Sequence, residues 1–260
     1  MFQESRLRML IDYRDLIWRL AWGDFKIRYK NSLLGFLWSL LEPMLMLLVL
    51  YVVFSYLMRI EVEHYQLFLL LGIVLWGFLD KGTNMSIVSI IGKPSMVQKV
   101  YFPREVLAIS SCLTALMMAG LEFLVFLAFA FYFKVYPGQA AIYFPLIFAL
   151  QYIFVSGLAL ALAALNVYFR DVQFIWRVVL QAGFFATPIL YPVTIFPPHI
   201  QNVMMINPLA RIISMSRDCL LYETVPASGD IAYVAGTSLL MLGLGYWIFR
   251  RLDPGFAEAI

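Results

Sequence analysis

The most restrictive feature of this sequence is a series of long apolar blocks that follow one another along most of its 260 residues. Each block runs for roughly 18–27 positions, and about 20 apolar residues in a helix span the hydrocarbon core of a bilayer. Backbone polar groups in lipid must be satisfied within helices or a closed barrel, and the ten-residue alternation of barrel strands is absent. The sequence therefore predicts an all-α integral membrane protein.

Composition excludes a soluble domain. The chain is 63% hydrophobic and 13% charged, whereas soluble domains are about 45–50% apolar and 25% charged. The first thirty residues carry charges throughout, so a cleavable signal peptide is not expected. The net charge of +3 gives no reason to expect a nucleic-acid partner.

Six transmembrane helices are predicted, within one domain of residues 1–260. The expected spans cover residues 33–57, 66–90, 106–133, 141–165, 172–192 and 231–249. Before them, residues 5–30 alternate apolar and charged side chains, which is typical of an amphipathic interfacial helix. The expected sections are therefore 1–32 (interfacial helix), 33–192 (spans one to five), 193–230 (an outer region) and 231–260 (span six and tail).

The segment 193–230 is too polar and too rich in proline for a full span. It holds two short apolar stretches, Ile200–Ile206 and Leu209–Leu221, flanked by Pro197, Pro198 and Pro208. Because proline breaks helices, these stretches are expected to form re-entrant or interfacial helices on the outer side.

Lysine and arginine counts predict the orientation. With the N-terminus inside, the inner segments hold seven, four, two and two basic residues, or 15 of the 19, and the outer segments hold four. Both termini are therefore expected on the cytoplasmic side.

Among the charged residues that fall within predicted spans are Glu42, Asp80, Lys81 and Glu122. Charges in a membrane are costly and are functional candidates by default. Interhelical hydrogen bonds, or a protonated glutamate, explain them without a transport role. Proton exchange is the alternative, although three carboxylates on three helices show no relay spacing.

No catalytic or metal site is apparent in the sequence. His64 and His199 fall in different outer segments without metal-ligand spacing, and Cys112 and Cys219 give no disulfide framework. Gly92-Lys93 is followed by Pro94 and lacks the upstream glycine of a phosphate-binding loop. The chain is therefore not expected to be an enzyme or to hydrolyse ATP itself.

Aromatic residues gather near the outer ends of spans one and five. The candidates for lining a substrate channel are Tyr51, Phe54, Phe184, Phe185 and Tyr191. An ordinary interfacial belt or packing explains such rings. The alternative is a smooth aromatic wall on which sugar rings stack weakly and slide.

Four segments resemble the type-2 ABC exporter permeases that carry O-antigen, capsule or teichoic-acid polymers. They are RYKNSLLGFLWSLLEP (Arg28 to Pro43), QKVYFPREVL (Gln98 to Leu107), LNVYFRDV (Leu165 to Val172) and the outer region Thr187 to Leu221. They lie in the family's order across most of the chain. Glu42 departs from the family's pattern, in which a neutral residue is expected before the proline.

The resemblance implies a permease that exports a lipid-linked polysaccharide across the bacterial cytoplasmic membrane. Two permease copies would pair with two ATP-binding cassette subunits, which would bind ATP and Mg, and this chain would need no cofactor. Spans one and five would line the channel, and the outer helices would gate it. The N-terminal helix and the Lys93–Glu105 loop, otherwise a plain connector, would dock on the ATPase through Lys99, Tyr101, Phe102, Arg104 and Glu105.

Three other functions are weighed against this one. A type-2 permease for a drug or small lipid belongs to the same class, although compact outer loops and many aromatics favour a polymer. A membrane-bound glycosyltransferase or lipid-modifying enzyme would need a polar catalytic cluster, which the sequence does not supply. A non-catalytic scaffold would not need the outer helices.

Overall fold

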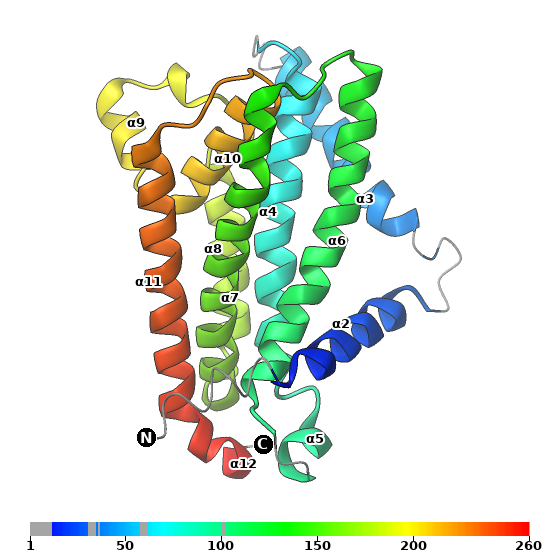
Figure 1. Cartoon of the computed structure of the whole chain (residues 1–260), viewed down its shortest axis with the longest axis vertical. Helices are drawn as coiled ribbons and strands as arrows, with labels where there is room; N and C mark the ends of the chain where they lie inside the picture. The colour runs from blue at the N-terminus through cyan, green and yellow to red at the C-terminus, as the bar shows by residue number, and fades with distance from the viewer. Residues whose placement is uncertain (1–11, 31–34, 36, 58–61, 100–101, 260) are drawn as a thin grey trace.

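The computed structural model describes residues 12–30, 35, 37–57, 62–99 and 102–259, and in these residues helices are joined by turns and loops, without strands (Figure 1). Among these residues, five helical segments are long and apolar enough to cross a membrane. They are Leu37–Ser55, which combines α3 (Leu37–Tyr51) with the start of the π-helix η1 (Val52–Leu57), α4 (Tyr65–Ile87), α6 (Glu105–Tyr132), α7 (Phe144–Tyr168, preceded by η2, Gln139–Tyr143) and α11 (Ser228–Leu252).

The predicted fifth span is shorter than expected. Helix α8 runs over Val172–Ala186, 15 residues, instead of continuing to residue 192. It ends two residues before Pro188, because a proline disfavours helical backbone in the residue that precedes it. The all-α prediction is confirmed for the described residues, and five of the six predicted spans have helices of membrane length.

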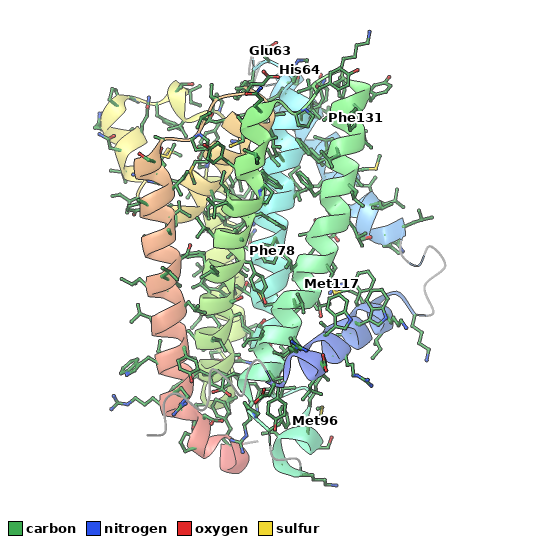
Figure 2. All side chains as sticks on the ribbon, in the orientation of Figure 1. Glu63, His64, Phe78, Met96, Met117 and Phe131 are labelled. Atoms are coloured by element: carbon green, nitrogen blue, oxygen red, sulfur yellow. The ribbon has the colours of Figure 1, made fainter. Side chains whose placement is uncertain are left out.

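Helix α4 lies at the centre of the bundle, packed between α6 and α7 (Figure 1). Its side chains are buried on most sides, and Phe78 stacks on Tyr152 at a ring distance of 6.4 Å (Figure 2). Buried amides tie α7 to it, because Gln151 Nε2 donates to Leu75 O at 2.7 Å and Asn166 Nδ2 donates to Ile87 O at 3.0 Å. Such interhelical hydrogen bonds compensate for the weak hydrophobic drive between helices in lipid.

Helices α7 and α11 approach closely through glycine. A Cβ atom on Gly157 would lie 2.5 Å from the backbone of Met241 and Leu242 on α11. Small residues at helix crossings let backbones approach in membranes. Otherwise α11 is open to its surroundings, with Leu239, Leu240 and Trp247 exposed.

The predicted outer region forms η3 (Val193–Ile195), α9 (Pro198–Met204) and α10 (Pro208–Leu220), at the end of the bundle opposite α5 (Figure 1). Pro198 and Pro208 are the first residues of α9 and α10. Pro at the first helical position loses no hydrogen bond, and the Asn207 side chain caps α10 by accepting from Leu209 N at 3.0 Å.

Arg217 anchors α10 in the bundle. Its guanidinium donates to the backbone oxygens of Phe68, Pro188 and Ile189 at 2.6–3.2 Å and lies 3.3 Å from the Phe68 ring centroid. Burial lowers the pKa of Arg217 to about 9, so this group is still a cation at neutral pH. Gly72 makes room for it, because a Cβ there would lie 2.7 Å from Arg217 Nη2.

The opposite end of the bundle gathers α2 (Arg14–Tyr29), α5 (Pro94–Lys99), η4 (Asp253–Gly255) and α12 (Phe256–Ala259) (Figure 1). Helix α2 packs against α6 through the buried Ala21. It exposes stacked Trp18 and Trp22, whose ring centroids are 6.3 Å apart. Within the stretch 5–30, predicted as an amphipathic interfacial helix, a helix runs over Arg14–Tyr29, and residues 5–11 lie outside the described part; its place at a membrane surface stays a prediction.

Candidate functional site

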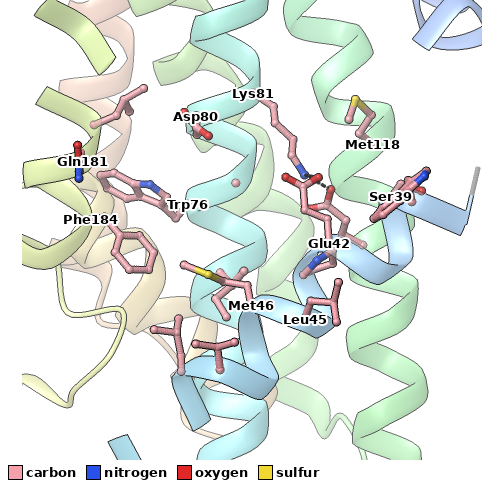
Figure 3. A pocket seen from close by; sticks show the side chains of 18 of the residues that line it. Ser39, Glu42, Leu45, Met46, Trp76, Asp80, Lys81, Met118, Gln181 and Phe184 are labelled. Carbon is pink, nitrogen blue, oxygen red and sulfur yellow. Dashed lines mark hydrogen bonds and ion pairs between the residues drawn. The ribbon is translucent and has the colours of Figure 1, made fainter. Parts of the chain in front are cut away.

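A cavity of about 1070 Å³ opens between α3, α4, α6 and α8 (Figure 3). Many of its lining residues are apolar side chains from three helices, among them Leu45, Met46, Val49, Leu50, Ile73, Trp76, Leu180, Phe184 and Phe185. Charged side chains gather on part of the lining: Arg28, Glu42, Asp80, Lys81, Glu122 and Arg177. The cavity therefore offers both apolar surface and fixed charges to an occupant.

Lys81 is the centre of the charged part. Its Nζ lies 2.6 Å from Glu122 Oε1 on α6 and 3.2 Å from Glu42 Oε2 on α3 (Figure 3). The Glu122 side chain is 2% exposed, whereas that of Glu42 is 60% exposed. Because a buried charge requires a partner, Lys81 and Glu122 form the fixed pair, and Glu42 joins it from the open side of the cavity.

Asp80 also lines the cavity and accepts a hydrogen bond from Asn84 Nδ2 on its own helix at 2.6 Å. The structure therefore brings the three predicted intramembrane carboxylates to one cavity. It connects Glu42 and Glu122 through Lys81, which is the interhelical bonding that the sequence analysis gave as the alternative to proton exchange.

Two of the five predicted channel aromatics, Phe184 and Phe185, line the cavity from α8. The Phe184 ring lies edge-on to Trp76 of α4 at 5.9 Å (Figure 3). Gly183 makes this approach possible, because a Cβ there would lie 2.9 Å from Trp76 Cη2. A second link between α8 and α4 is the 2.8 Å hydrogen bond from Trp176 Nε1 to Thr83 Oγ1.

The other three predicted channel aromatics are not among the residues that line this cavity. Tyr51 lies 6.2 Å from the Tyr65 ring, and Phe54 packs against the main core. Tyr191 donates from its hydroxyl to Phe185 O at 2.7 Å. These three positions therefore support the walls around Phe185 and α4, and their role in conduction stays a prediction.

The predicted ATPase-docking residues divide into exposed and internal ones. Lys99 is exposed at the end of α5, and Tyr101 lies outside the described residues. Phe102 and Glu105 are buried. Arg104 Nη1 donates to Asp253 O at 2.7 Å and to Asp253 Oδ1 at 3.3 Å. Of the described four, only Lys99 is fully exposed to a second protein.

The sequence profile of the ABC-2 type transporter family matches residues 15–221. The chain belongs to this ABC-2 type transporter family. The match covers α2 to α10 and so includes the cavity, the α5 loop and the outer helices. With five helices of membrane length in the part that the structure describes, the chain is a multi-pass membrane protein.

Three relatives extend the likeness over almost the whole chain. An O-antigen export system permease protein of Klebsiella pneumoniae is 32% identical over 252 residues, 95% of each chain. One of Myxococcus xanthus is 32% identical over 257 residues, 98% of each chain. A polysialic acid transport protein of Escherichia coli is 24% identical over 240 residues, 88% of this chain and 90% of the relative.

Membership of the ABC-2 family makes the chain a transport subunit rather than an enzyme, and implies a separate ATP-binding partner subunit. The sequence analysis missed Trp76, Arg28 and Arg177 as lining residues of the permease cavity. Arg28 is the first residue of one of the segments that resemble the family, but nothing in its spacing indicates that its side chain lines the cavity.

Proposed function

We propose that this chain is the permease subunit of an ATP-driven exporter that moves a lipid-linked polysaccharide across the bacterial cytoplasmic membrane. The observation that carries the proposal is the 32% identity, over 95–98% of the chain, to O-antigen export permeases from two organisms. A transport protein for polysialic acid, a different polysaccharide, is also similar over most of the chain. These relatives are all named for the transport of polysaccharides, but not of the same polysaccharide.

The cavity supports a large amphipathic substrate. Pockets for drug-sized ligands are about 300–1,000 Å³, and this cavity of about 1070 Å³ in one subunit slightly exceeds that range. Phe184, Phe185 and Trp76 offer ring faces and edges for sugar C–H surfaces, while Arg28 and Arg177 offer cations.

We propose a homodimer that pairs with two ATP-binding subunits, which would bind ATP and Mg. The segment Leu37–Ser55 and helix α8, which wall the cavity, also expose apolar rows that include Leu48, Val52, Ile175 and Val178. A second permease copy would cover these rows and close the cavity into a channel. The α5 loop, with Lys99 exposed, would contact the ATPase, and Tyr51, Phe54 and Tyr191 would extend the aromatic lining outward.

The proposed topology has six spans with both termini cytoplasmic, with α8 as the fifth span and α9 and α10 as outer gating helices, all within one domain of residues 1–260. Glu63 and Met96 lie at opposite ends of the bundle (Figure 2). A cysteine at Glu63 or Gln201 should react with an impermeant thiol reagent on intact cells, and one at Gln98 should not. The reverse labelling pattern would overturn the orientation.

The function is tested by removing the chain from a host that displays its polysaccharide. Surface polymer should disappear and polymer should accumulate inside the cell, and re-expression of the chain should reverse both. Normal surface polymer without the chain would contradict the proposal.

The second candidate is export of a drug or a small lipid, which the mainly apolar lining of the cavity favours. It predicts that loss of the chain leaves surface polymer unchanged and raises the cell's sensitivity to apolar drugs, or its internal level of one lipid.

A further inference from the structure

The loop that carries α5 is tied at both ends by ion pairs to other parts of the chain. Just before α5, Lys93 Nζ donates to both carboxylate oxygens of Asp24 on α2, at 3.0 and 2.7 Å. Just before α6, Arg104 Nη1 donates to the backbone oxygen and to Oδ1 of Asp253 in η4. One short segment is thereby connected to helices near both ends of the sequence.

Both pairs are sheltered from solvent. The side chains of Lys93 and Asp24 are 26% and 25% exposed, and those of Arg104 and Asp253 are 20% and 23% exposed. By contrast, the side chains of the Arg14–Asp15 pair on α2 are 77% and 85% exposed. Exposed pairs contribute little, whereas losing one partner of a sheltered pair leaves a charge without compensation.

Apolar anchors fix the loop between the two pairs. Val97 of α5 and Phe102 are both buried in the core cluster at this end of the bundle, together with Phe256. The Arg104 guanidinium carbon lies 5.9 Å from the Phe256 ring centroid, within range of a cation–π interaction. The loop is therefore joined both to the α2 side and to the α12 side.

The Asp24 contact leads towards the cavity. Asp24 is one helical turn before Arg28, which lines the cavity. The α2 backbone is attached to α6 through the 3.2 Å hydrogen bond from Thr114 Oγ1 to Ala21 O. A displacement of Lys93 is thus passed to α2 and to the Arg28 end of that helix, while Asp253 passes a displacement of Arg104 to the end of α11.

We infer that Asp24 and Asp253 are positioning residues that couple the α5 loop to the cavity and to α11, through their ion pairs with Lys93 and Arg104. This inference rests on the proposed function, in which the loop meets the ATP-binding subunit. Coupling needs an element whose contacts differ between two states, and two sheltered ion pairs supply contacts that a moving loop stretches or relaxes.

The test compares Asp24→Asn and Asp253→Asn with Asp15→Asn, the matched control on the exposed pair of α2. Each variant is made in the full permease with its ATP-binding subunit. Three quantities are measured: assembled complex, ATP hydrolysis by that complex, and surface polymer. Asp24→Asn should lower polymer export by about tenfold, equivalent to 1.4 kcal/mol of coupling, while assembly and ATP hydrolysis persist. Asp15→Asn should export normally.

The exchanged pair Asp24→Lys with Lys93→Asp keeps the ion pair and should recover most of the export. An assembled exchanged pair that exports no better than Asp24→Asn would overturn the inference, as would normal export by both asparagine variants. If wild-type complex exports no polymer at all, the proposed function fails instead, so the two failures are distinguishable.

Discussion

Helices α4 and α3 lie side by side, yet they are packed in opposite ways. In an 18-residue apolar stretch of each span, 67% of the α4 residues are buried within the chain. Only 17% are buried in the corresponding stretch of Leu37–Ser55, which contains α3, although α3 is the more apolar helix. Helix α4 receives hydrogen bonds from Gln151, Asn166 and Trp176, so its polar groups are satisfied by neighbours. Hydropathy therefore identifies spans, but the polar partners distinguish the fixed helix from the open one.

The cavity lies along this boundary. Its fixed side is α4 with α6, and its open side is formed by α3 and α8. Lys81 connects the two sides, because it holds the buried Glu122 and the half-exposed Glu42 together. A transporter needs walls that move against a fixed frame, and the sparsely packed helices are the ones that can move at the lowest free-energy cost.

The largest effect is expected in the packed region, from Arg217→Leu. This substitution leaves the backbone oxygens of Phe68, Pro188 and Ile189 without the hydrogen bonds that Arg217 donates. Because hydrogen bonds to a charged group are lost, the free energy of unfolding should fall by at least about 3 kcal/mol in total. The measurement is thermal unfolding of the purified permease. Arg170→Leu, at an exposed position, is the control, and equal melting temperatures for the two variants would show that α10 is not anchored in this way.

The two carboxylates that share Lys81 should differ in effect. Glu122→Gln removes a buried charged hydrogen bond and should cost about 1.5–3 kcal/mol of stability. Glu42→Gln removes a half-exposed partner and should cost about 0–1 kcal/mol. Both are compared by chemical or thermal unfolding in the same detergent. A larger loss for Glu42→Gln would reverse the assignment of fixed and open sides.

Gly157→Leu should cost about 1–3 kcal/mol by overpacking the contact between α7 and α11. Gly243→Leu on α11 is a matched control, because a Cβ there meets nothing within 4 Å. Unfolding measurements on both variants separate the packed contact from the general effect of leucine. Similar stability for both would contradict a close crossing at Gly157.

A small effect on stability is also expected from the aromatic residues of the open side. Phe184→Leu with Phe185→Leu should change stability by less than about 1.5 kcal/mol per site, since leucine keeps an apolar wall, but it should slow polymer export. Tyr51→Leu with Phe54→Leu tests whether rings outside the cavity contribute. Surface polymer is measured at matched levels of assembled complex, and wild-type export by both double variants would remove an aromatic path from the account.

Much of the fold follows from the sequence, because length and apolarity set the positions of α3, α4, α6, α7 and α11. The end of α8 at Ala186 was missed, since one proline sets it within an apolar block. Phe184 and Phe185, predicted on the fifth span, lie on α8 and line the cavity, but their partner Trp76 was not identified. Glu42, Lys81 and Glu122 come together because of how three helices pack. This packing leaves no repeating pattern in the sequence from which the contact could have been predicted.

The central claim, that polymer passes through the cavity between the open and fixed sides, is tested most directly by blocking the cavity. Gln181→Cys places a thiol on α8 in the cavity lining, and the native Cys112 and Cys219 are buried and so give little background. After equal modification with a bulky maleimide, Gln181→Cys should lose export, while Ser228→Cys, exposed at the start of α11, should retain it. Full export by completely modified Gln181→Cys would contradict the account.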